Sequence, residues 1–258
     1  IDAEEVERLF DTPLESKTVI LGKDSAKNYA YTYVLVFVMY LMVIFYGQMI
    51  ATSVTSEKSN RAIEILVTST DSDSLIFGKV IAGAVASLVQ GGVILGAGLI
   101  SYHFLHNAWN NKLDFLFDIP RNVWATFIVF GILGYLLYAF LFGMLGALVS
   151  KTEDISKSSM PVTLIYIAAF IIAVVGMNMP DSMMMKVASF VPFTSCNSMF
   201  IRVAMGTVTK PEVVISALLL GISCVLTGML ASKIFRFGTL LYGNPIKLRT
   251  AFRKIREK

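Results

Sequence analysis

Charged residues are scarce in this chain of 258 residues: Asp, Glu, Lys and Arg make up 16%, against 55% hydrophobic residues. Soluble domains carry roughly 25% charged and about 45–50% apolar residues. One soluble core cannot bury such an excess of apolar side chains, and the mean hydropathy of +0.69 agrees with this. The composition therefore predicts that lipid is the solvent of most of the chain.

Residues that build active sites are also few. The two cysteines, Cys196 and Cys224, make no disulfide framework, and we expect both to be free packing residues. His103 and His106 lie one helical turn apart, but zinc takes three or four ligands, and no others stand near them. We interpret the pair as part of an interfacial aromatic belt and predict no metal site and no catalytic residues.

A nucleotide site is missing as well. A phosphate-binding loop needs Gly, four residues, then Gly-Lys-Ser/Thr, and neither Gly22-Lys23 nor Gly78-Lys79 completes that pattern. We expect no cofactor on this chain and no nucleic-acid partner.

Long apolar stretches are what the sequence does have. A spanning helix needs about 20 mostly apolar residues, and the sequence predicts an all-α, polytopic membrane protein. Residues 1–28 would precede its transmembrane domain (29–235), and a basic tail (236–258) would follow it. The five predicted spans are 29–54, 75–101, 123–149, 160–177 and 213–234.

The basic residues predict the orientation. Thirteen Lys and Arg fall on the side of the C-terminal tail and nine on the other side. By the positive-inside rule the C-terminus is cytoplasmic and the acidic start lies outside. A start on the outside implies an upstream span.

The interior of the spans holds almost no charge; Gln48 and Gln90 are the main strongly polar side chains there. Small residues instead recur at four-residue spacing, which lets helices pack closely. These sets are Gly83-Ser87-Gly91, Gly92-Gly96 and Ala139-Gly143-Ala147.

The segment 178–210 is too polar and proline-interrupted to span. It predicts two short helices, 182–190 and 197–205. Irregular backbone is tolerated at membrane depth only where protein or a water cavity shelters it. The segment is therefore either a lid over an exit path or a surface loop on the outer leaflet.

The first cytoplasmic loop, 56–69, has the sharpest pattern. Glu57, Arg61 and Glu64 fall on one stripe of a helix, with apolar residues opposite. This predicts a short amphipathic helix with a ridge of ion pairs, which would either rest on lipid or contact a partner.

This loop resembles that of type-2 ABC exporter permeases, which read Glu-Lys-x-x-x-Arg-x-x-Glu-x-Leu before a Gly-Lys that opens the next span. The matching loop residues are Glu57, Lys58, Arg61, Glu64 and Leu66, followed by Gly78 and Lys79. The sequence 191–195 and Arg202 resemble the outer loop between the last two spans of that family, and 237–243 resembles the ending of its NatB-like (sodium-extrusion) subgroup.

The resemblance implies a permease subunit in which those five loop residues form a coupling helix seated on a separate ABC ATPase subunit. That partner would carry ATP and Mg. It implies an outer gate at Pro192, Phe193 and Arg202, a second permease copy, and a bacterial plasma membrane. The subgroup has six spans, so the first span and most of an extracytoplasmic domain are expected upstream.

The substrate stays open between sodium and an amphiphile, peptide or drug. A secondary carrier and a structural or sensory membrane protein are the rival interpretations.

Overall fold

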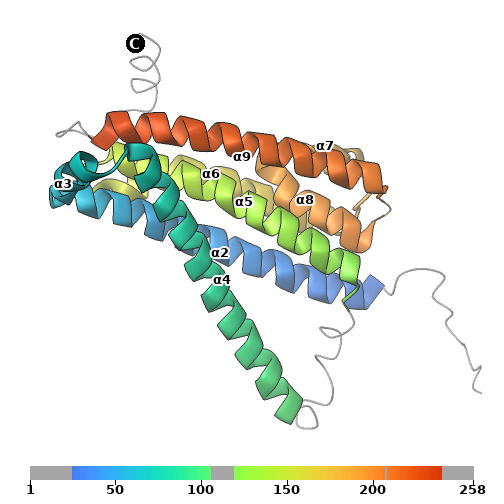
Figure 1. Cartoon of the computed structure of the whole chain (residues 1–258). Coiled ribbons are helices and arrows are strands. Elements are labelled where there is room, and N and C mark those ends of the chain that lie inside the picture. Colours follow the sequence, from blue (N-terminus) through green and yellow to red (C-terminus); the bar gives the residue numbers. More distant parts are fainter. Residues whose placement is uncertain (1–24, 106–118, 207, 240–258) are drawn as a thin grey trace, which may run out of the picture.

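The structure is a computed structural model that describes residues 25–105, 119–206 and 208–239, and these ranges contain helices and no strand (Figure 1). Residues 240–258 of the predicted basic tail and the side chains of His103 and His106 lie outside what the structure describes, whereas residues 236–239 belong to the last helix. The elements are α2 (Ser25–Ser59), α3 (Ala62–Ser69), α4 (Ser72–Leu105), α5 (Arg121–Leu148), the 3-10 turn η2 (Thr152–Asp154), α6 (Ile155–Gly176), α7 (Met183–Ala188), α8 (Pro192–Met205) and α9 (Lys210–Thr239).

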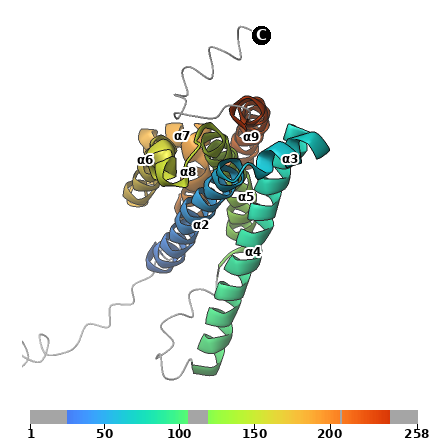
Figure 2. The same ribbon diagram turned by 90° about the vertical axis from the view of Figure 1, so that its left-hand side faces the viewer.

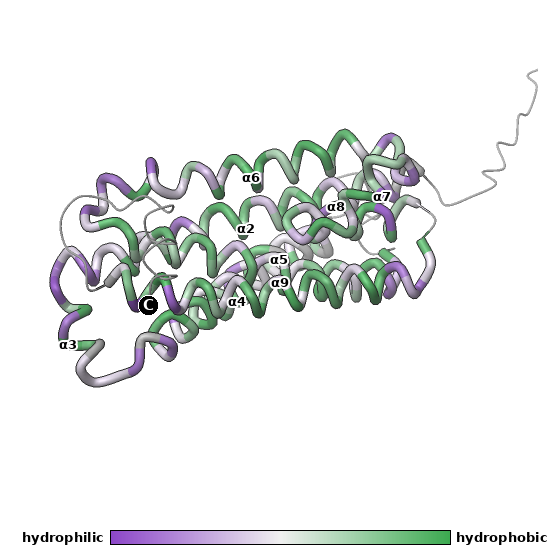
Figure 3. Tube along the Cα trace, turned by 90° about the horizontal axis from the view of Figure 1, so that it is seen from above, coloured by the Kyte–Doolittle hydropathy of each residue, from purple (hydrophilic) through white to green (hydrophobic). Residues whose placement is uncertain are grey.

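Within the described ranges, five helices are long and apolar enough to cross a membrane: α2, α4, α5, α6 and α9. They coincide with the five predicted spans, most of which the helices exceed by a few residues at each end. A prediction from apolar stretches misses those ends, because a helix continues into polar residues wherever its backbone hydrogen bonds are still formed. Figure 3 shows the same division, with hydrophilic residues gathered at the two ends of the bundle and hydrophobic ones between.

Helix α5 is the centre of the bundle. It packs against α2, α4, α6, α8 and α9, and its aromatic residues Phe130, Tyr138 and Phe142 are fully buried. The approach of α2 to α5 is close, since a Cβ added at Gly146 would lie 2.5 Å from the Ala51 carbonyl oxygen. Thr55 ties the same two helices by donating to the Gly146 carbonyl oxygen over 2.9 Å.

Helix α4 diverges from the bundle (Figures 1 and 2). Only 18% of its most apolar window is buried, compared with 61% for α5. Gly83 packs against Ile50, as its motif predicts, whereas Gly92 and Gly96 have no neighbour within 4 Å of an added Cβ. The expectation of close helix packing at that second pair is therefore wrong within the described chain.

The two short helices α7 and α8 are present, with one boundary corrected. The second helix begins at Pro192 rather than at residue 197. Proline fits the first helical position because the missing N–H would have no helical partner there. Residues Ser195 to Ala204 of α8 are all buried, so this helix lies inside the bundle and is not a loop on its surface.

Candidate functional site: the α3 junction

The chain turns sharply between α2 and α3. Arg61 adopts a left-handed conformation (φ 57°) and its N–H donates to the Lys58 carbonyl oxygen over 3.1 Å. The predicted continuous ridge of Glu57, Arg61 and Glu64 is therefore wrong, because Glu57 belongs to α2 and Glu64 to α3. A left-handed residue ends a helix, and the heptad-like spacing no longer places the three side chains on one face.

Glu57 finds its partner on another helix. Its carboxylate forms an ion pair with the ammonium of Lys79 in α4, and Lys79 also donates to the Ser53 hydroxyl over 3.1 Å. These contacts join the end of α2 to the beginning of α4. Lys79, predicted only as the residue that opens the next span, is thus half of the inter-helix link.

Lys58 is fully buried at the same junction. Its ammonium donates to the carbonyl oxygens of Ala147 (2.9 Å) and Gly238 (2.7 Å), which lie in the last turns of α5 and α9. Helix C-termini carry partial negative charge, so they favour a cation. This side chain has no exposed surface in the structure, and its contact with an ATPase subunit stays a prediction.

One face of α3 is anchored in the bundle. Ile63 is 1% exposed and Leu66 is packed beside it. Together they close a small hydrophobic cluster with one residue or more from each of four long helices: Val54, Leu75, Ile76, Ala147 and Phe235. A displacement of α3 therefore acts on α2, α4, α5 and α9 at once.

The opposite face of α3 is exposed. Arg61, Glu64 and Thr68 are exposed there, and Ile65 is 74% exposed. This outward face, residues 61, 64, 65 and 68, combines both charge signs with one large apolar side chain. Such a composition suits a protein partner.

The residues predicted as an outer gate, Pro192, Phe193 and Arg202, lie at opposite ends of α8, with Pro192 and Phe193 at its beginning and Arg202 in its last turn. All three lie in α8, and the Phe193 carbonyl oxygen accepts a hydrogen bond from Tyr138 over 2.7 Å. Arg202 is 1% exposed; it donates to the Ser189 hydroxyl over 2.8 Å and to Glu212 of α9 over 2.9 Å. Glu212 was missed by sequence reasoning, since it lies ten positions further along, across a helix boundary.

The described residues contain no group of three or more His, Cys, Asp or Glu that would hold a metal ion. Cys196 and Cys224 are free and buried, as predicted.

In the described residues, five apolar helices long enough to cross a bilayer are the architecture of a polytopic α-helical membrane protein. The model of the family described as "ABC-2 family transporter protein" matches residues 4–233, and the chain belongs to that family. This confirms the predicted relationship to type-2 ABC permeases, while the NatB-like subgroup stays a prediction.

Two relatives illustrate the match. The uncharacterized protein YhaP of Bacillus subtilis is 32% identical over 234 residues, covering 87% of this chain and 54% of the relative. The uncharacterized protein MJ1024 of Methanocaldococcus jannaschii is 26% identical over 223 residues, covering 86% of this chain and 53% of the relative. The chain thus spans about half the length of these relatives. No solved structure matches it.

Proposed function

We propose that this chain is part of the permease subunit of an ATP-driven exporter, and that α3 is its coupling helix. One observation carries the proposal. The inner face of α3 is fixed to the ends of four spanning helices, while its outer face is exposed and chemically suited to a protein partner. A movement of the partner against that outer face would be transmitted through α3 to four of the spanning helices.

The partner in this proposal is an ABC ATPase subunit that binds ATP and Mg, so no catalytic residue is assigned to this chain. A second permease copy would complete the path across the bilayer. The α3 end and the C-terminus would face the cytoplasm of a bacterial cell, and α7 and α8 the outside. Pro192, Phe193 and Arg202 would then belong to an outer gate. Support for the orientation comes from the basic residues, which favour the α3 side.

The rival functions find less support. Secondary carriers place binding groups at interrupted helices near the membrane midplane, whereas α2, α4, α5, α6 and α9 run without interruption. A purely structural role does not explain why α3 is anchored in the bundle on one face and exposed on the other. Sodium, peptides, drugs and amphiphiles remain the candidate substrates.

The deciding experiment is co-purification of the full-length protein with the ABC ATPase of its own cells. Ile65→Glu places a charge on the outward face of α3 and should reduce the recovered ATPase by about tenfold, as loss of an interface contact of roughly 1.4 kcal/mol predicts. Thr152→Glu is the control, because Thr152 is exposed in η2 at the same end of the bundle. Equal recovery with both variants, at equal expression, would remove the coupling role of α3.

A further inference from the structure

Two helix ends of like charge meet beside the α3 junction. Ala147 lies in the last turn of α5 and Gly238 in the last turn of α9. A Cβ added at Gly238 would lie 2.7 Å from the Ala147 carbonyl oxygen, so the two main chains are in close contact. The carbonyl groups of a last helical turn have no helical donor, and they give each helix end roughly half a negative charge. The two ends therefore repel each other unless a cation lies between them.

Lys58 supplies that cation from a third helix. Its ammonium donates to both carbonyl oxygens, over 2.9 Å to Ala147 and 2.7 Å to Gly238. Helices α2 and α9 each pack chiefly against α5, so this side chain is a direct link from α2 to α9. The main-chain carbonyl oxygen of Lys58 accepts from the N–H of Arg61 in the turn before α3. Lys58 thus belongs to the turn through its backbone and to the ends of α5 and α9 through its side chain.

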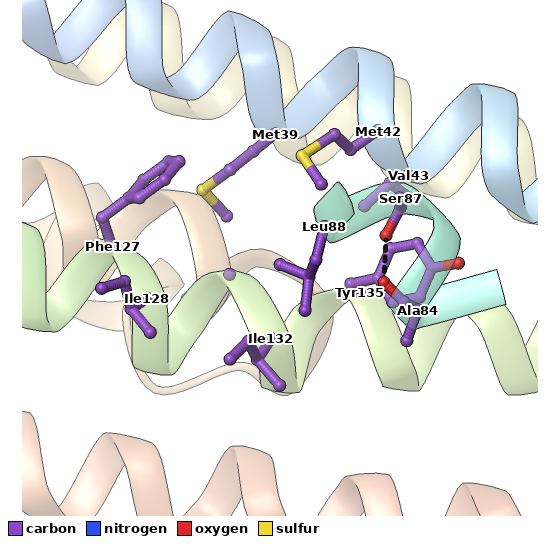
Figure 4. A pocket seen from close by; sticks show the side chains of 11 residues that line it. Met39, Met42, Val43, Ala84, Ser87, Leu88, Phe127, Ile128, Ile132 and Tyr135 are labelled. Atoms are coloured by element: carbon purple, nitrogen blue, oxygen red, sulfur yellow. Dashed lines mark hydrogen bonds between the residues drawn. The ribbon is translucent and has the colours of Figure 1, made fainter. Parts of the chain in front are cut away.

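Helix α4 is attached to the same junction in a different way. Its link to α2 is the ion pair of Lys79 with Glu57, whose side chains are 16% and 30% exposed. Further along, a cavity of about 100 Å³ lies between α2, α4 and α5, lined by Met42 and Tyr135 among others (Figure 4). A second cavity of about 580 Å³, also lined by Met42, lies between α2 and α4. We name the two cavities together the α2–α4 groove. Because of this groove, the middle of α4 packs loosely against α2.

Two separate links therefore leave the end of α2. A partly exposed ion pair joins it to α4, and a buried cation joins it to α5 and α9. The apolar cluster around Ile63 fixes α3 to the same helices, but apolar side chains cannot offset the negative charge of two helix ends.

We propose that Lys58 is a positioning residue for transport. It holds the ends of α5 and α9 together at the turn that carries α3, so that both helices follow a movement of α3. The inference rests on the proposed function, to which it adds the residue that passes this movement on to α5 and α9.

The first measurement needs no ATPase. Lys151, just after α5, and Lys233 in α9 are exposed, and cysteines at these two positions can carry spin labels that report the distance between the helix ends. The full-length protein is used in nanodiscs, with Cys196 and Cys224 replaced by alanine. Lys58→Met should lengthen and broaden the distribution of this distance, because the two ends then repel each other.

Lys79→Met is the matched control. The same substitution removes a cation of the same junction, but one that bonds to Glu57 and Ser53 in α2 rather than to the ends of α5 and α9. The distance between the labels should therefore stay as in the unaltered protein.

A second variant leaves Lys58 in place. Gly238→Ala adds a methyl group against the Ala147 carbonyl oxygen, so the end of α9 must shift away from α5 and the label distance should again lengthen. Gly78→Ala is its control, because a Cβ there meets nothing within 4 Å in the described chain. Gly238→Ala keeps the test decisive if Lys58→Met is too unstable to purify.

The second measurement uses the complex with the ABC ATPase. Lys58→Met and Gly238→Ala leave the outward face of α3 unchanged, so both should recover as much ATPase as the unaltered protein. Both should lose most of the change in ATP hydrolysis rate that the permease causes, because α5 and α9 no longer follow α3. Normal recovery with lost stimulation separates positioning from binding.

Three results would overturn the inference: an unchanged label distance in Lys58→Met, equal lengthening in Lys79→Met, or a tenfold loss of ATPase recovery in Lys58→Met. The last would favour the direct contact with the ATPase that the sequence predicts for Lys58. If the unaltered protein recovers no ATPase, the coupling role of α3 fails, while the label distances still decide whether Lys58 holds the two helix ends together.

Discussion

Lys58 shows how a charge is accommodated in an apolar junction. Its ammonium has carbonyl oxygens of α5 and α9 as its hydrogen-bond acceptors, and it lies at the end of α2. Lys58→Met keeps the length of the side chain but leaves those two carbonyl oxygens without their donor. Hydrogen bonds to charged groups contribute about 1.5–3 kcal/mol each in proteins, so we expect a loss of at least about 2 kcal/mol in the free energy of unfolding.

Thermal unfolding of the purified protein in detergent measures this loss as a lower midpoint. Lys157→Met is the control, because the Lys157 side chain is 86% exposed and surface changes usually stay within about 0.5 kcal/mol. An unchanged midpoint for Lys58→Met would contradict the buried geometry.

The Arg202–Glu212 pair predicts an asymmetry between two substitutions. The Arg202 side chain is 2% exposed and that of Glu212 is 35% exposed. Glu212→Leu leaves a buried guanidinium without its counter-charge, which should cost about 1–3 kcal/mol, less than for a fully buried pair because the carboxylate is partly exposed. Glu212→Gln keeps an acceptor oxygen and should cost clearly less.

The double variant Arg202→Met, Glu212→Leu should regain part of the stability lost in Glu212→Leu, since no charge then remains unpaired. Unfolding midpoints of the three variants give the comparison. Equal midpoints for Glu212→Leu and Glu212→Gln would show that the charge of Glu212 does not stabilise Arg202.

At the scale of the element, Arg61 has two roles that substitutions can distinguish. Its backbone forms the turn before α3, and its side chain belongs to the outward face of α3. Arg61 holds a left-handed conformation that costs a non-glycine residue about 1–2 kcal/mol and glycine almost nothing. Arg61→Gly should therefore preserve or slightly raise the thermal midpoint. It should also lower ATPase recovery, because it removes a side chain from the outward face of α3.

Arg61→Ile is the comparison variant. A β-branched residue fits the left-handed region poorly, so this variant should lower the thermal unfolding midpoint. Arg61→Gly with a clearly lower midpoint would show that the side chain, rather than the turn, holds the junction together.

At the scale of the whole molecule, the two ends of the bundle should be reachable from opposite sides of the membrane. Ser156 is exposed at the beginning of α6, and Met183 is 75% exposed at the beginning of α7, beyond the far end of α6. In right-side-out vesicles, Met183→Cys should react with an impermeant maleimide and Ser156→Cys only after the membrane is opened. Cys196 and Cys224 are both buried and contribute little background. Labelling of both positions from one side would overturn the five-span topology.

The sequence alone determined the class of the protein and the positions of its spans. Hydrophobic length is a local property, so the stretch 29–54 predicts α2 whatever surrounds it. The loop pattern Glu57-Lys58 to Leu66 likewise predicted the family, because a motif is read along the chain. The existence of two short helices after residue 178 followed from proline and polarity in the same way.

Only the tertiary structure decided what the individual side chains contact. Lys58 donates hydrogen bonds to carbonyl oxygens 89 and 180 positions away. Every residue has a main-chain carbonyl, so no sequence pattern can identify which ones will accept. Glu57 joins Lys79 instead of Arg61 because one left-handed residue redirects the chain. The divergence of α4, and with it the groove beside Tyr135, depends on how whole helices pack, which no local spacing encodes.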